Sequence, residues 1–180
     1  DEQQMSARVA SPAIDKLKTK PLFHRWIGLL PDKVMMVRQS RAPGPCFEPA
    51  NQVFYGGQLE ADERVQKARE ADNDKAGIWK DHTKPIASIR TTSKESKQQG
   101  ERSYRNLGEA QTCANTVKHV VHNSRGVFKY EDVGIITMYK AHGDSLRQEL
   151  QKLGIPISSD KGPGVSVDTV DRYQGMQRKI

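Results

Sequence analysis

The sequence of 180 residues has only two cysteines, Cys46 and Cys113, and they lie far apart in the chain. Two distant cysteines cannot provide the disulfide framework of a small secreted domain or a cysteine-rich zinc site. We therefore expect free thiols and a reducing, intracellular compartment. Nucleus and cytoplasm both remain open.

The sequence also lacks long hydrophobic runs. No apolar stretch approaches the roughly 20 residues that a membrane-spanning helix needs, and the N-terminus has no signal-peptide pattern. We therefore expect no membrane partner. The chain starts at Asp1 rather than at Met, and Ile180 directly follows a motif, so we expect both ends to be boundaries within a longer protein.

Two kinds of ligand site are missing as well. The sequence has no G-x-x-x-x-G-K-[ST] phosphate-binding loop, and its one glycine-rich stretch, residues 161–164, lacks that spacing. His119 and His122 share a helical face, but no third ligand is evident near them. We therefore expect no metal site, and the two histidines are interpreted as solvated or packed side chains.

Positive charge is what the sequence has in excess, with 29 Lys and Arg against 22 Asp and Glu and a formal net charge of +7. Clustered cations gain free energy by displacing counterions from phosphate backbones, so this balance favours a polyanionic partner such as nucleic acid. Hydrophobic residues make up 35% of the chain, which suits one compact domain with a core.

Short β-rich runs alternate with polar or helical stretches along the chain. The runs are residues 34–37, 86–89, 133–137 and 165–167. Two segments have apolar residues at helical spacing, and their expected core faces are Ala110, Ala114, Val117 and Val121 in the first and Tyr139, Leu146, Leu150 and Leu153 in the second. This alternation predicts an α/β fold with a parallel β-sheet flanked by helices.

The remaining segments are less regular. Gly154 and Pro156 indicate where the second helix ends, and residues 21–30 predict a further helix before the first strand. Residues 60–81 are dense in charged side chains, and residues 93–105 contain almost nothing apolar. We expect exposed insertions or loops over the region 60–105.

The most specific stretch, residues 165–177, reads VSVDTVDRYQGMQ. A strand that runs into Thr169, Asp171 and Gly175 delivers polar side chains and a glycine to one edge of a sheet, where open α/β folds bind their ligands. Gly175 would let the backbone approach a phosphate or ribose closely. The alternative is an ordinary strand-to-helix turn with Asp171 as its N-cap.

This stretch closely resembles motif V, T-V-D-x-[FY]-Q-G-x-E, of the superfamily 1 helicases. Four further matches follow the family order. DEQQM at 1–5 matches the end of motif III, and MVRQSR at 36–41 followed by VFYGGQL at 53–59 matches Q-Y-R-M-H-P followed by F-Y-x-G-x-L. Ser103, Asn106, Glu109 and Ala110 match S-x-x-N-x-x-E-A. GIITMYKAH at 134–142 matches G-I-[IV]-T-P-Y-x-x-Q. The resemblance covers nearly the whole chain, and the group it is most similar to is that of the nonsense-mediated-decay and senataxin-like helicases.

The resemblance implies that residues 1–180 are the C-terminal RecA-like domain of a helicase, a P-loop NTPase fold without its own P-loop. Residues 1–30 would then be the lead-in from the first RecA-like half. In the family, ATP and Mg²⁺ lie between the halves and are bound mainly by the first one. The implied partners are that N-terminal half of the same parent chain and single-stranded RNA or DNA, and the isolated chain is expected to be inactive.

Two catalytic positions follow from the resemblance. Arg41 takes the place of the arginine finger, whose planar charged fork meets γ-phosphate oxygens during phosphoryl transfer, and Gln4 takes the place of the γ-phosphate sensor. From spacing alone, Arg41 would be a solvated surface arginine, and the flanking Gln39 and residues 54–55 favour the finger. The expected nucleotide-facing residues are Gln39, Gln174, Gly175 and Gln177.

The expected nucleic-acid contacts are Thr137, Tyr139 and Thr169. In the family, the two threonine hydroxyls contact the sugar-phosphate backbone, which positions a strand without reading its sequence. Each hydroxyl could instead cap the helix that follows it. Tyr139 could stack on a base or be a half-buried packing residue.

Several positions depart from the family pattern. Ser40 replaces the tyrosine that usually stacks on adenine, and Gln177 replaces the glutamate associated with the ribose. Further replacements are Ala42, Pro43, Met138 and His142. Because the losses gather around the nucleotide base and sugar, a second function stays open: a non-catalytic nucleic-acid-binding or scaffold module that keeps the fold without turnover.

Overall fold

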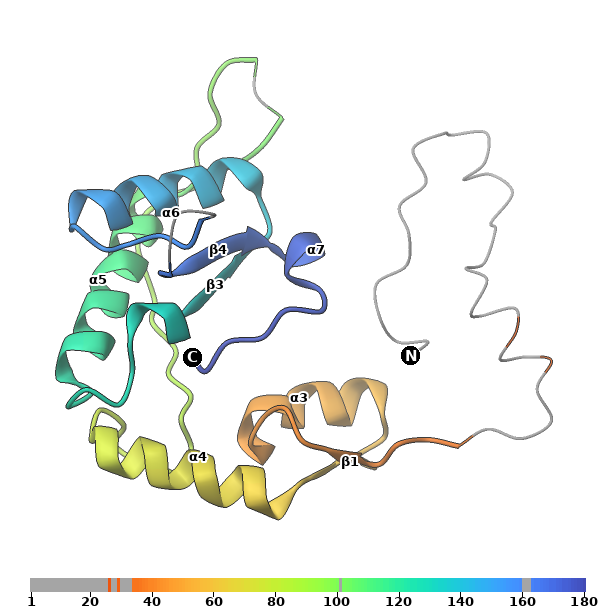
Figure 1. Ribbon diagram of the computed structural model, residues 1–180. Helices are drawn as coiled ribbons and strands as arrows, with labels where there is room; N and C mark the ends of the chain where they lie inside the picture. Colours follow the sequence, from red (N-terminus) through yellow and green to blue (C-terminus); the bar gives the residue numbers. More distant parts are fainter. Residues whose placement is uncertain (1–25, 27–28, 30–33, 101, 160–162) are drawn as a thin grey trace. The chain divides into compact units, whose positions relative to one another are not determined.

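The computed structural model (Figure 1) describes residues 26, 29, 34–100, 102–159 and 163–180. Gln4, the proposed lead-in over residues 1–30 and the helix expected at 21–30 lie outside these residues, apart from positions 26 and 29. The chain divides into two compact units, residues 1–65 and 66–180, and each is described by itself.

The first unit contains a short parallel strand pair, β1 (Arg38–Gln39) and β2 (Glu60–Ala61), connected through α3 (Gly44–Phe54). Asn51 of α3 is buried, and its side-chain amide accepts from the N–H of Leu59 at 2.9 Å and donates to the Leu59 carbonyl at 3.1 Å. This amide bridge fixes the segment that enters β2.

The prediction of a strand at residues 34–37 is wrong, because β1 begins only at Arg38. Val34 and Met36 are 94% and 86% exposed, so no sheet face buries their apolar side chains. The strand expected at residues 86–89 is also absent, and Ile86 and Ile89 are more than half exposed. Apolar β-branched residues predict a strand only where a partner strand or a core is available to them.

Part of the polar region 60–105 is helical rather than a loop. Residues Glu63–Ala76 form α4, which is rich in Glu, Lys, Arg and Ala, all good helix formers. Only Asn73 and Ala76 of this helix are buried, and Asn73 donates to the His82 carbonyl at 3.2 Å. Residues 91–100 are exposed throughout, as expected.

The second unit is built on two parallel strands, β3 (Gly134–Thr137) and β4 (Ser166–Thr169) (Figure 1). A short 3-10 helix (Tyr130–Asp132) precedes β3, and α7 (Val170–Tyr173) follows β4. The helices α5 (Leu107–Asn123) and α6 (Lys140–Lys152) pack against each other, and α6 also packs on both strands. The predicted parallel α/β architecture is therefore confirmed.

The core of this unit lies between the strands and the two helices. Its members from α5 are Ala110, Ala114 and Val117, those from α6 are Leu146 and Leu150, and those from the strand segments include Ile135, Val165 and Val167. Leu146 and Leu150 are at most 2% exposed, and burying a leucine side chain contributes about 1.5 to 3 kcal/mol. Helix α6 ends at Lys152, Leu153 is its C-cap, and Gly154 follows with a φ of 69°.

The prediction that Tyr139 belongs to the core face of its helix is wrong. Tyr139 is the N-cap of α6, with an extended backbone, and it is 43% exposed. The turn after β3 takes this residue off the helical repeat that Leu146 and Leu150 follow. The Tyr139 side chain therefore lies at the surface and not in the core.

Glycine at the start of β3 lets the end of α7 approach closely. A Cβ at Gly134 would collide with the Tyr173 hydroxyl. That hydroxyl pairs with the Ser166 hydroxyl at 3.0 Å, and Tyr173 is buried. The absence of a side chain at Gly134 thus allows the residues that follow β4 to fold back over β3.

Candidate nucleic-acid interface

The two candidate threonines lie side by side at one edge of the sheet. Thr137 and Thr169 are the last residues of β3 and β4, and the register of the two strands pairs them directly. Parallel strands bring their carboxyl ends to the same edge, where loops and helix starts leave room for a ligand. Helices α6 and α7 begin at this edge.

The two hydroxyls have different local roles. Thr137 is 6% exposed, and its hydroxyl accepts from the Tyr139 N–H at 3.3 Å and donates to the Tyr139 carbonyl at 3.4 Å. It therefore shapes the turn into α6, whose N-cap is Tyr139 and which has no side-chain capping hydrogen bond. Thr169 is half-buried at the N-cap of α7, and its side chain makes no capping hydrogen bond there.

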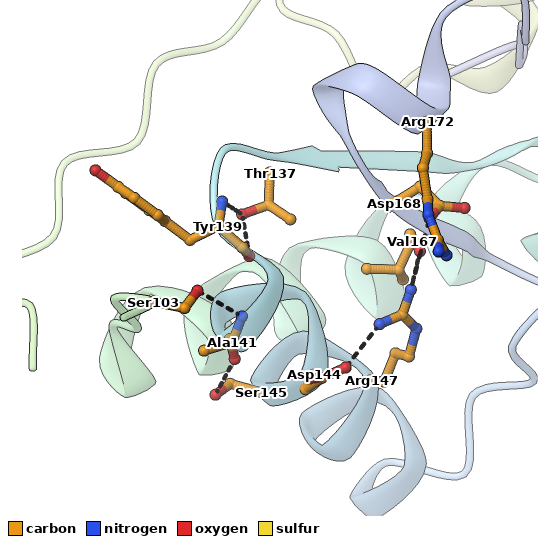
Figure 2. A network of polar contacts seen from close by, with 10 residues as sticks. All are labelled: Ser103, Thr137, Tyr139, Ala141, Asp144, Ser145, Arg147, Val167, Asp168 and Arg172. Carbon is orange, nitrogen blue, oxygen red and sulfur yellow. Dashed lines mark hydrogen bonds and ion pairs between the residues drawn. The ribbon is translucent and has the colours of Figure 1, made fainter. Parts of the chain in front are cut away.

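Two motifs from different parts of the sequence meet beside Thr137. The Ser103 hydroxyl accepts from the Ala141 N–H at 3.0 Å, which ties the segment before α5 to the first turn of α6 (Figure 2). The Asn106 N–H donates to Nδ1 of His142 at 3.3 Å, and the Asn106 side chain caps α5 through the Glu109 N–H at 3.1 Å. The starts of α5 and α6 are thereby held together.

A hollow of about 260 Å³ lies at this junction. Tyr104 and Tyr139 line it and contact each other edge to face, with their ring centroids 5.6 Å apart and their planes at 60°. The other lining residues are Glu95, Arg105, Asn106, Glu109, Cys113, Ile135, Ile136, Thr137, Met138, His142 and Leu146. Burial raises the pKa of the Cys113 thiol, and the nearby Glu109 carboxylate raises it further, so this cysteine is held as the neutral thiol.

A cluster of charged side chains joins α6 to the end of β4 (Figure 2). The Arg147 guanidinium donates to the Val167 carbonyl and pairs with Asp144 at 3.0 Å and with Asp168 at 3.9 Å. Arg172 of α7 also pairs with Asp168, at 4.0 Å. These contacts fix β4 against α6 one residue before Thr169.

In the first unit, Gln39 organises the turn that carries Arg41. Its side-chain oxygen accepts from the backbone N–H groups of Arg41 and Ala42 at 2.9 and 3.1 Å, and its amide nitrogen donates to the Ala42 carbonyl. Arg41 is exposed at this turn. Gln39 therefore has a clear structural role, and its contact with a nucleotide stays a prediction.

The remaining nucleotide-facing candidates lie after α7. Gly175 has a φ of 86°, a left-handed conformation that favours glycine, so the backbone turns sharply here. Gln174, Gly175 and Gln177 are exposed.

Within the described ranges, no group of three His, Cys, Asp or Glu side chains is arranged to hold a metal ion. No described helix has the length and apolar character required to cross a membrane.

Comparison with known proteins decides the family. Residues 19–180 match the model of a family described as an AAA domain. The chain belongs to this family. Together with the relatives below, the match shows a superfamily 1 helicase domain of the senataxin-like type, and the α/β fold of the second unit is that of a RecA-like helicase domain.

Three relatives of this helicase domain are themselves named helicases. The chain is 25% identical to the probable helicase senataxin of Mus musculus and 26% identical to that of Homo sapiens, in each case over 177 residues and 98% of the chain. It is 28% identical over 187 residues, and 99% of the chain, to an uncharacterized ATP-dependent helicase of Methanocaldococcus jannaschii. The chain spans 6% of each senataxin and 26% of the archaeal protein.

Several contacts at this edge of the helicase domain have no signal in the sequence. The contact of Tyr104 with Tyr139 joins positions 35 apart, and no local pattern signals it. Arg147 pairs with Asp144 at helical spacing, which the sequence could have indicated, but its contact with Asp168 depends on how α6 packs on β4.

Proposed function

We propose that this chain is the second RecA-like half of an ATP-dependent helicase that moves along single-stranded RNA or DNA. The observation that carries the proposal is the register of Thr137 with Thr169 at the carboxyl edge of the sheet, next to the starts of α6 and α7. A strand laid along this edge would meet the Thr169 hydroxyl and backbone N–H groups. Such contacts suit a motor that must pass every sequence.

The nucleotide would be bound mainly by the first RecA-like half, which would supply the P-loop and the carboxylates for Mg²⁺. From this chain, the exposed Arg41 would reach the γ-phosphate as an arginine finger, with Gln4 as the γ-phosphate sensor. Gln174, Gly175 and Gln177 would face the sugar and phosphates. ATP binding and hydrolysis would then change the distance between the halves while each grips the strand.

The rival function is a nucleic-acid-binding or scaffold module without turnover. The replacements Ser40 and Gln177 favour it, because both fall where the family contacts the nucleotide base and ribose. The two functions differ in one respect that can be measured, since both bind nucleic acid but only the helicase hydrolyses ATP.

The proposed interface predicts weak binding to single strands with little sequence preference and a steep dependence on salt. Each phosphate neutralised on a single strand contributes a slope of about −0.7 in log K against log salt. Fluorescence anisotropy of labelled RNA and DNA oligonucleotides across a salt series measures both affinity and slope. Binding that ignores salt, or tight binding to one sequence alone, would contradict the backbone interface.

A single hydroxyl tests the position of the strand. Thr169→Val keeps the shape of the side chain but removes one hydrogen bond, so affinity should fall about 2-fold to 10-fold. Thr116→Val is the matched control, because Thr116 lies on α5, where its hydroxyl bonds the Thr112 carbonyl of its own helix. Equal losses in the two variants would place the strand elsewhere.

A further inference from the structure

The hollow beside Thr137 is not used by the backbone contacts proposed above. It has a volume of about 260 Å³, smaller than a typical site for a drug-sized ligand and suited to one small flat group. Two tyrosines line it, and they remain 40% and 43% exposed at Tyr104 and Tyr139. Aromatic faces that stay open at a nucleic-acid edge are platforms on which bases stack.

The charges around the hollow discriminate between parts of a nucleotide. Glu95, Glu109 and Arg105 line the hollow, so its wall has two carboxylates against one guanidinium. This excess of negative charge disfavours a phosphate, and the carboxylates can accept hydrogen bonds from amino groups. The Lys97 ammonium lies over the Tyr104 ring, 5.4 Å from its centroid, so a cation lies against one face of the aromatic platform. An uncharged ring with N–H donors therefore fits inside, and the phosphate attached to it fits near the lysine.

The apolar part of the wall supports the same occupant. Ile135, Ile136 and Met138 come from β3 and the residue after it, and Ile136 and Met138 are 56% and 73% exposed. Exposed apolar side chains beside open aromatic rings are typical of a surface that is covered by a partner. A flat heterocycle would cover them while its edge reaches the carboxylates.

We infer that this hollow accepts one unstacked nucleobase of the bound single strand, and that it favours bases with an exocyclic amino group. This inference rests on the proposed function, because the strand must first lie along the carboxyl edge. The base stacks against the Tyr104 and Tyr139 platform, and its amino group donates to Glu109 or Glu95. The amino groups of cytosine and adenine can donate hydrogen bonds to these carboxylates, whereas uracil and thymine have no amino group.

The test compares oligonucleotides that share a backbone and differ in their bases. The full-length protein, without nucleotide, is titrated by fluorescence anisotropy with oligomers of about ten residues that carry cytosine, uracil or thymine, or no base at all. Ribose and deoxyribose series are run at one salt concentration. Relative to the cytosine oligomer, the abasic oligomer should bind about 5-fold to 100-fold more weakly, and the uracil or thymine oligomer should lie between them.

Two variants locate the effect in the hollow. Tyr104→Leu should remove most of the difference in affinity between the cytosine and abasic oligomers. Tyr104→Phe keeps the ring and should therefore keep this difference. Glu109→Gln removes the negative charge and should bring the cytosine and uracil oligomers closer together in affinity. Because Tyr104 and Glu109 are both exposed, we expect each variant to fold, and its thermal unfolding midpoint checks this.

Each outcome has a distinct meaning. Equal binding of intact and abasic oligomers would overturn the base site and leave the backbone interface standing. Failure of every oligomer to bind would overturn the proposed function and the base site with it. An abasic penalty that survives Tyr104→Leu, or equal affinity for cytosine and uracil in the unmodified protein, would also overturn the inference.

Discussion

Replacing Arg41 by alanine in the full-length protein should lower ATP turnover about 10³-fold or more and leave ATP binding largely intact. An arginine finger acts on the charge that develops on the γ-phosphoryl group, so its loss raises the barrier without removing ground-state binding. Arg41→Lys should recover little, because a lysine ammonium cannot reproduce the planar fork. The measurement is steady-state turnover together with the Kd of a non-hydrolysable ATP analogue.

The control for this prediction is Arg38→Ala. Arg38 is an exposed arginine of β1 in the same unit, outside the Gln39 turn that presents Arg41. Its loss changes the net charge by the same amount as the loss of Arg41. Wild-type turnover in Arg41→Ala, or an equal loss in both variants, would remove Arg41 from the catalytic role.

The protein should hold the base of ATP loosely, because Ser40 stands where the family has a stacking tyrosine. An aromatic face against a base contributes about 1 to 3 kcal/mol, so its absence should weaken ATP binding about 5-fold to more than 100-fold. Phosphate contacts common to all nucleoside triphosphates would then dominate. GTP, CTP and UTP should support turnover comparable to that with ATP.

Restoring the ring tests the same idea from the opposite side. Ser40 is exposed next to the Gln39 turn, so Ser40→Tyr can place a ring there without displacing buried atoms. This variant should tighten purine nucleotides selectively in a nucleotide titration. Strong ATP selectivity before the change, or no purine-specific gain after it, would show that other residues hold the base.

The helices of the second unit could be predicted from the sequence because their cores repeat at helical spacing. Ala110, Ala114 and Val117 are buried on α5 as expected, and so are Leu146 and Leu150 on α6. The strands that end in Thr137 and Thr169 were also predicted, since a dense apolar run precedes each polar end. Local pattern and tertiary burial agree at these positions.

The strand predictions failed where a local pattern had no tertiary partner. Val34 and Ile86 have strong β propensity, yet both are exposed, because propensity describes how well a side chain fits a half-buried surface. The Tyr104 and Tyr139 contact and the Arg147 and Asp168 pair could not be predicted either. Both join residues that only the packing of α6 brings together, so no spacing in the sequence reveals them.

The most direct test of the central claim is the ATPase activity of this chain alone, with Mg²⁺ and a single-stranded oligonucleotide present. The chain has no P-loop to cradle the phosphates, so as a second RecA-like half it should show no turnover above background. Comparing it with its Arg41→Ala variant separates its own activity from that of a contaminating ATPase. Turnover by the isolated chain that disappears with Arg41→Ala would contradict the account, because this chain would then hold a complete active site.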